Sequence, residues 1–265
     1  KDAVFQWRGI PQPGQLLPLG LQHVVAAVVG VITPAILVAD TCGLSSADKT
    51  LMIQVSLILT ALATLLQLFP IFHRIGSGLP VIMGISFAYI PTLQAIGGEF
   101  GLPTILGAEI VGGIVAIVFG VLVKWIRPLF PPLVTGTVIF TIGLSLYPTA
   151  VKYMAGGAGS EWFGSAKSWA VALITLAVVV FLNHFTKGIT KLASILIGIL
   201  AGYVIAYFLG IVDLSGVGSA AWVALPRPMP FDIQFVPAAC VSLGIVYVVN
   251  AVQTIGDLSS TTMGG

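Results

Sequence analysis

Eight apolar runs of near membrane-spanning length dominate this 265-residue chain. A helix that crosses a bilayer needs about 20 consecutive, mostly apolar residues. Strands of a membrane β-barrel would instead alternate apolar and polar residues over about ten positions, and these runs are apolar on all sides. The pattern predicts an all-α polytopic membrane protein with segments at Leu19–Ala39, Leu51–Phe72, Gly78–Ile96, Leu102–Val123, Leu129–Ala150, Trp169–Leu182, Leu192–Val212 and Ile233–Val252.

The composition supports the same class. Charged residues make up 8% of the chain, against about 25% in soluble domains, which excludes a disordered segment, a nucleic-acid binder and an ordinary cytosolic enzyme domain. Two Cys residues exclude a disulfide scaffold and a Cys-based zinc site. The sequence has no HExxH, GxSxG, P-loop or GxGxxG motif, so we expect neither an enzyme nor a cofactor.

Charge also predicts how the segments are oriented. The loops on the side of the N-terminus carry seven Lys or Arg and one acid, whereas the opposite loops carry four and six. By the positive-inside rule the N-terminus is cytoplasmic, in a plasma or inner membrane. All five Trp residues lie at or near segment ends, as expected for an aromatic belt at the lipid–water interface.

The third segment carries signs of a broken helix. Gly and Pro residues crowd positions 76–80, and Pro91 interrupts the run. Because Pro80 lacks an N–H and disfavours helix at the residue before it, we expect Leu79–Met83 to be extended and a half-helix to begin near Gly84 or Ile85. Such breaks in membrane helices are typical of transporter binding sites. The alternative is an ordinary helix with a proline kink.

A polar face follows the eighth segment. Asn250, Gln253, Thr254 and Asp257 recur at a spacing of three to four, which places them on one side of a helix. The Gln253 amide offers a donor and an acceptor that match a heterocyclic lactam edge. Asp257, one turn on, is placed to orient that amide, to take a coupling proton or to bond the backbone of an opposite structural repeat. The alternative is a polar helix end that has reached water.

Four further residues are candidates. Phe87, near the expected half-helix start, is placed to stack on a planar ligand, with the backbone N–H groups of Phe87 and Ala88 close to its carbonyls. His23 lies near the start of the first segment and is either a site residue or a packed histidine. Glu109 is a proton-binding group or an acid that reaches the interface, since an ionisable group inside a membrane is a functional candidate by default.

Four stretches in register resemble the nucleobase–ascorbate transporter family, the xanthine/uracil permeases. They are Leu21–His23, Gly84–Tyr89, Phe130–Val138 and Gln253–Asp257. The resemblance implies two inverted repeats of seven helices, with residues 1–232 as the first repeat and 233–265 as the truncated start of the second. It also implies a substrate pocket in which Gln253 binds the base edge, Phe87 stacks, Gly30 lines the wall, and His23 and Asp257 tune affinity and coupling.

The resemblance further implies a secondary active transporter of nucleobases. We expect a purine such as xanthine or urate, coupling to a proton or sodium ion, alternating access and a homodimer in the lipid bilayer. Gln253 departs from the Glu that the family usually has, and an amide does not titrate. Alternatives are a bicarbonate or sulfate transporter of the same two-repeat fold and a non-transporting fragment.

Overall fold

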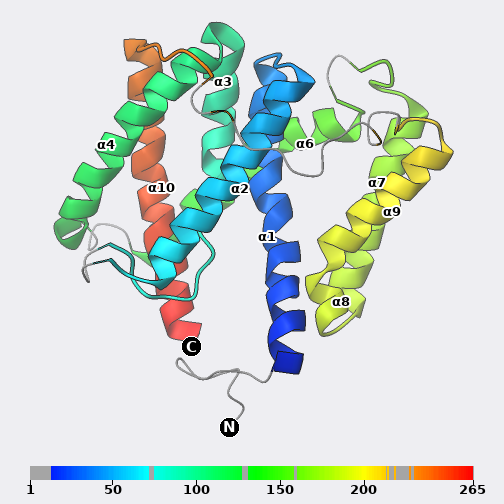
Figure 1. Ribbon diagram of the computed structural model, residues 1–265, viewed down its shortest axis with the longest axis horizontal. Coiled ribbons are helices and arrows are strands. Elements are labelled where there is room, and N and C mark those ends of the chain that lie inside the picture. The colour runs from blue at the N-terminus through cyan, green and yellow to red at the C-terminus, as the bar shows by residue number, and fades with distance from the viewer. Residues whose placement is uncertain are drawn as a thin grey trace. The chain divides into compact units, whose positions relative to one another are not determined.

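The structure is a computed structural model that describes residues 13–71, 75–126, 131–157, 160–212, 214, 218, 227 and 230–264. Phe72, Leu129 and Phe130, which belong to predicted segments or motifs, lie outside the described residues. The described elements are helices (Figure 1), namely α1 (Pro13–Thr41), α2 (Ser46–Leu68), η2 (Phe87–Tyr89), α3 (Ile90–Phe100), α4 (Leu102–Ile126), α5 (Pro132–Ser145), α6 (Tyr147–Met154), α7 (Ala166–Phe185), α8 (Ile189–Leu192), α9 (Ser194–Phe208) and α10 (Pro237–Gly264).

The all-α prediction is confirmed, and helices lie in all eight predicted segments. Within the described ranges, four helical stretches are long and apolar enough to span a membrane: Ser46–Leu68, Leu102–Val123, Ala166–Phe185 and Pro237–Leu258. Ala27–Thr41 and Ser194–Phe208 are shorter apolar helices. The chain therefore has the make-up of a multi-pass membrane protein.

Three predicted segments differ in their bounds from the helices of the structure. The fifth segment divides between Ser145 and Tyr147, because Pro148 has no N–H with which to continue the preceding helix. The sixth begins earlier, at Ala166, because the Ser165 side chain accepts a hydrogen bond of 3.2 Å from the Ser168 N–H and caps the helix. The eighth continues past its polar residues to Gly264.

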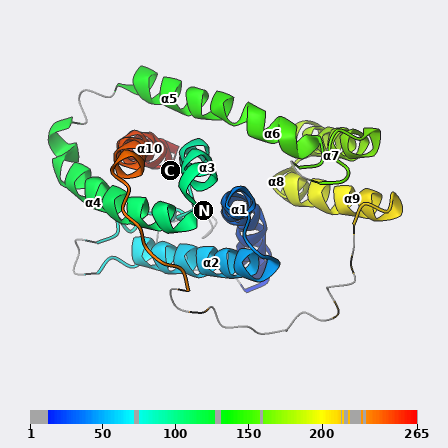
Figure 2. The ribbon, with the colours of Figure 1, turned by 90° about the horizontal axis from the view of Figure 1, so that it is seen from above.

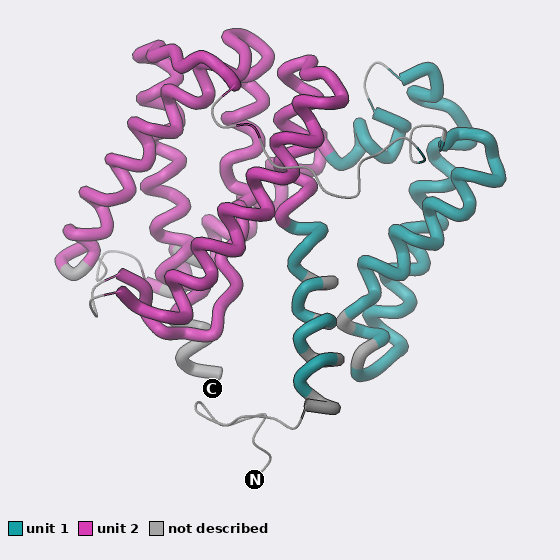
Figure 3. The backbone as a smooth tube through the Cα atoms, viewed as in Figure 1, with its two compact units in different colours: residues 1–30, 150–224 teal, residues 31–149, 225–265 magenta. Residues whose placement is uncertain are grey.

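The chain divides into two compact units (Figure 3). Unit 1 comprises residues 1–30 and 150–224, and unit 2 comprises residues 31–149 and 225–265. The division falls within α1 and within α6. The boundary at residue 232, which the family resemblance implies, separates two inverted repeats of helices. The two compact units do not test it, and it stays a prediction.

Unit 2 is organised around α10. Helices α3, α4 and α10 lie side by side in both ribbon views (Figures 1 and 2), and α10 packs most extensively on α4. Their apolar core also takes in the end of α1, and its buried members are Val38, Leu93, Ile96, Leu102, Ile105, Ala108, Ala239 and Leu243. This core fixes α3 and α10 relative to each other. Helix α10 carries Gln253, and α3 directly follows η2, which begins with Phe87.

Glycines allow close approaches between elements in both units. In unit 1, a Cβ at Gly198 would overlap Val179 and one at Gly202 would overlap Thr175, so α9 lies against α7 as the small-residue spacing predicts. In unit 2, a Cβ at Gly107 would overlap the Gln234 carbonyl. Two other α4 glycines, Gly113 and Gly120, make no such close approach in the described part of the chain, where no atom lies within 4 Å of an added Cβ.

Candidate functional site: a helix break facing α10

The third segment is broken as predicted. Residues 76–86 are not helical, and helix resumes only at Phe87. Gly76 and Gly78 have φ angles of 93° and 72°, a region that residues with a side chain rarely adopt, so these glycines let the chain turn back from the end of α2. Pro91 does not kink a helix. It occupies the first turn of α3, where a missing N–H costs nothing.

Two polar side chains of α2 hold the non-helical segment, residues 76–86. The Gly78 N–H donates to the Gln67 carbonyl oxygen over 2.8 Å, and the Gln67 side-chain amide donates to the Ser77 hydroxyl. Further along, the Met83 N–H donates to the Thr64 hydroxyl over 3.0 Å. These bonds satisfy backbone groups that lipid cannot, which is the condition for irregular backbone at membrane depth. Thr64 and Gln67 carry no sequence signal that sets them apart from other polar residues of an apolar helix.

Ser86 fixes where the half-helix starts. Its backbone is extended, with φ −76° and ψ 132°, and its hydroxyl accepts a hydrogen bond of 3.3 Å from the Ala88 N–H. This is the geometry of a helix N-cap. The half-helix therefore begins at Phe87, two or three residues later than the predicted start at Gly84 or Ile85, because neither of those residues has a side chain that can cap a helix.

Gln253 on α10 faces this helix start. The Ser86 hydroxyl donates to the Gln253 Oε1 atom over 3.2 Å, across 167 positions of sequence. The Gln253 side chain also hydrogen-bonds the carboxyl group of Asp257, one turn further along α10. The Gln253 side chain thus has neighbours on two sides, Ser86 and Asp257.

The two neighbours leave half of the amide's hydrogen-bonding capacity unused. A Gln side chain has two N–H donors and two acceptor lone pairs. Ser86 takes one lone pair, and Asp257, as an acceptor, takes one N–H. One N–H and one lone pair remain, which is the complement of a ring edge that presents a carbonyl beside an N–H.

The remaining candidate residues divide between the two units. Phe87 is partly buried in η2 and is adjacent to Ser86 in sequence. The Ala88 N–H is bonded to Ser86, so the cap occupies one of the two backbone donors that we expected to meet a ligand. Phe87 begins the helix, and its N–H has no partner within the helix. His23, which is exposed, and Gly30 belong to unit 1, whereas Gln253 belongs to unit 2. The structure therefore does not test whether these residues share a site.

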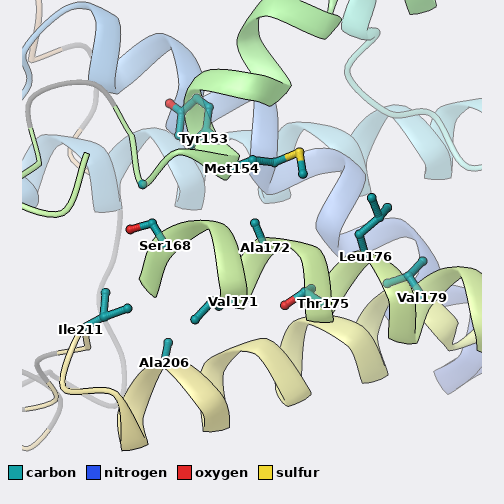
Figure 4. A pocket seen from close by; sticks show the side chains of 11 residues that line it. Tyr153, Met154, Ser168, Val171, Ala172, Thr175, Leu176, Val179, Ala206 and Ile211 are labelled. Atoms are coloured by element: carbon teal, nitrogen blue, oxygen red, sulfur yellow. The ribbon is translucent and has the colours of Figure 1, made fainter. Parts of the chain in front are cut away.

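Unit 1 contains a cavity, whereas the helix break belongs to unit 2. It has a volume of about 470 Å³ and lies along α7, with Ala172, Leu176 and Val179 on one side and Ala206 of α9 on another (Figure 4). Its polar lining consists of single hydroxyls such as those of Ser168 and Thr175. The Ser168 hydroxyl already donates to the Trp162 carbonyl oxygen over 2.9 Å. The cavity offers shape but little that recognises a polar ring, so the helix break is the better candidate site.

Comparison with known proteins decides the family. A family model described as "Permease family" (Xan_ur_permease) matches residues 14–263. This chain belongs to that permease family. The permease family match spans both units and includes the helix break and the polar face of α10.

Individual relatives agree with the family match. A xanthine permease of Bacillus subtilis is 38% identical over 244 residues, which cover 92% of this chain and 56% of the relative. The uric acid permease PucK of the same organism is 38% identical, with 91% and 56% covered. The uric acid transporter UacT of Escherichia coli is 33% identical, with 93% and 52% covered. The chain thus spans a little over half the length of these relatives, which are permeases rather than enzymes.

Proposed function

We propose that the full-length protein containing this chain is a secondary active transporter of purine nucleobases such as xanthine or urate. The observation that carries the proposal is the Gln253 amide, held by Ser86 and Asp257 beside the start of a broken helix. The relatives named above are described as a xanthine permease, a uric acid permease and a uric acid transporter. In this proposal the free N–H and lone pair of Gln253 pair with the lactam edge of the base.

The proposal assigns a role to each predicted site residue. Phe87 stacks on the base, and its backbone N–H, with that of Ala88 once the cap opens, approaches a ring carbonyl. Gly30 lines the pocket, while His23 and Asp257 set affinity. The protein works by alternating access with proton symport, as a homodimer in the plasma or inner membrane with its N-terminus in the cytoplasm. Support for the orientation is the excess of Lys and Arg in the loops on that side.

Uptake by cells tests the substrate class directly. We expect a bacterium that lacks its own nucleobase permeases, and expresses the full-length protein, to take up labelled xanthine or urate saturably. A protonophore is expected to abolish the uptake. Unlabelled uracil in tenfold excess serves as a competitor and should leave most of the uptake in place. Uracil uptake without xanthine or urate uptake would overturn the purine assignment, and sulfate or bicarbonate uptake would favour the anion transporter instead.

A further inference from the structure

A second polar centre lies one helix away from Gln253. Glu109 is partly buried in α4, within the membrane-spanning stretch Leu102–Val123. The Tyr247 hydroxyl, on α10, donates a hydrogen bond to the Glu109 carboxyl group. A charge inside a bilayer costs at least about 2.5–3.5 kcal/mol on insertion scales, so a carboxyl group within this spanning stretch is expected to serve a function.

The sequence of α4 makes room for this pair. A Cβ on Gly112, one turn after Glu109 on the same face, would overlap the Tyr247 ring. Glycine at this position therefore lets the aromatic ring approach α4 closely while its hydroxyl reaches Glu109. The arrangement depends on both helices at once, and α4 and α10 form the largest helix–helix contact of unit 2.

Tyr247 connects Glu109 to the broken helix. Its ring packs edge-on against the Tyr89 ring, with centroids 4.8 Å apart and planes at 60°. Tyr89 lies in η2, three residues after Ser86 and two after Phe87, and its hydroxyl hydrogen-bonds the side chain of Asn250. A movement of Tyr247 is thus passed by direct packing to the turn that bears the candidate site.

No described cation neutralises Glu109. Among the described residues, the titratable groups that interact with Glu109 are Tyr247 on α10 and Tyr89 in η2. The acid of α3, Glu99, is exposed near the end of that helix. Arg227 lies beside Leu102 and Leu106, at the start of α4, and forms no ion pair with Glu109 in the described part of the chain. Protonation would remove this charge when lipid or protein closes over the group.

We propose that Glu109 binds the coupling proton and acts on the substrate site through Tyr247 and Tyr89. The proposal rests on the transport function above, and Gln253 leaves this role open because an amide does not titrate. Hydronium delivers the proton, an O–H bond forms on one carboxyl oxygen, and water is left. The reverse step returns the proton to water on the other side. The neutral carboxyl no longer requires the Tyr247 donor, so Tyr247 and the η2 turn are released together.

Proteoliposomes that contain the full-length protein test this role with labelled xanthine. With an imposed pH gradient of about one unit, one coupled proton supports about tenfold accumulation, since one unit is a tenfold ratio of proton activity. We expect Glu109→Gln to abolish this accumulation and its pH dependence, yet to keep xanthine exchange without a gradient within about twofold, because the base contacts are intact. Glu99→Gln, the same change at an exposed acid of α3, should behave as wild type.

Each outcome decides the matter. Accumulation by Glu109→Gln with a wild-type pH profile overturns the inference alone, whereas failure of the wild-type protein to exchange any nucleobase overturns the proposed function. If Glu109→Gln loses exchange as well, Tyr247→Phe decides. That variant keeps the carboxyl group but removes its donor, and we expect the midpoint of its uptake–pH profile to move about one unit toward higher pH. An unmoved midpoint overturns the inference.

Discussion

Replacing Gln253 with Leu in the full-length protein is expected to lower the initial rate of xanthine uptake roughly 100-fold or more. Leu has similar length but no hydrogen-bonding group, so the base loses two hydrogen bonds, and Ser86 and Asp257 lose their shared partner. Net hydrogen bonds contribute about 0.5–1.5 kcal/mol each, and an unsatisfied buried polar group costs about 1–3 kcal/mol more. A total near 3 kcal/mol corresponds to about 100-fold in affinity.

The measurement is uptake at substrate concentrations below KM, divided by the amount of protein in the membrane. Gln234→Leu is the matched control, because Gln234 is exposed, lies outside the helices and uses its backbone N–H, not its side chain, to bond Pro103. We expect Gln234→Leu to stay within about twofold of wild type. Uptake by Gln253→Leu within threefold of wild type would show that this amide does not bind the transported base.

The second large effect is expected at the turn where α2 gives way to the non-helical segment. Gly76→Ala places a Cβ where it overlaps the Leu66 carbonyl oxygen, in a backbone conformation with φ 93°. The φ angle alone costs about 1–2 kcal/mol for a residue with a side chain, and overpacking adds about 1–3 kcal/mol. The segment can relieve the clash only by moving away from Gln67 and Thr64, which releases the backbone that precedes Ser86.

Thermal melting of the purified full-length protein, with xanthine uptake in parallel, measures this effect. Gly43→Ala separates the two causes, because Gly43 also has a positive φ angle, 64°, but no atom lies within 4 Å of the added Cβ. We expect Gly43→Ala to lower stability by about 1 kcal/mol and to retain transport, and Gly76→Ala to lose both stability and transport. Equal behaviour of the two variants would mean that close packing on α2 is not needed.

Sequence patterns predicted most of the helical framework. The length and uniform apolarity of the runs placed helices in all eight predicted segments, because lipid exposure leaves few alternatives for the backbone. The Gly and Pro residues at positions 76–80 predicted the break, since their effects on φ and on the N–H donor are local. The polar face around Gln253 was also predictable, because helical spacing alone brings Asp257 one turn away.

Residues that act through long-range contacts were harder to predict. Thr64 and Gln67 look like ordinary polar positions of an apolar helix, and only the return of residues 76–86 along α2 shows which backbone groups they bind. Ser86 was visible only as part of a motif, since its bond to Gln253 joins positions 167 residues apart. The sequence marks Glu109 as unusual, but its partner Tyr247 lies on a different helix, so helical spacing does not connect the two residues.

The location of bound xanthine in the full-length protein tests the central claim most directly. An experimental structure with xanthine is predicted to show the base between Phe87 and α10, with its lactam edge within hydrogen-bond distance of the Gln253 amide. In that structure residues 76–86 should remain non-helical. A base bound elsewhere, such as in the cavity along α7, with Gln253 facing lipid or with an unbroken helix from Leu79 to Ile96, would contradict this account.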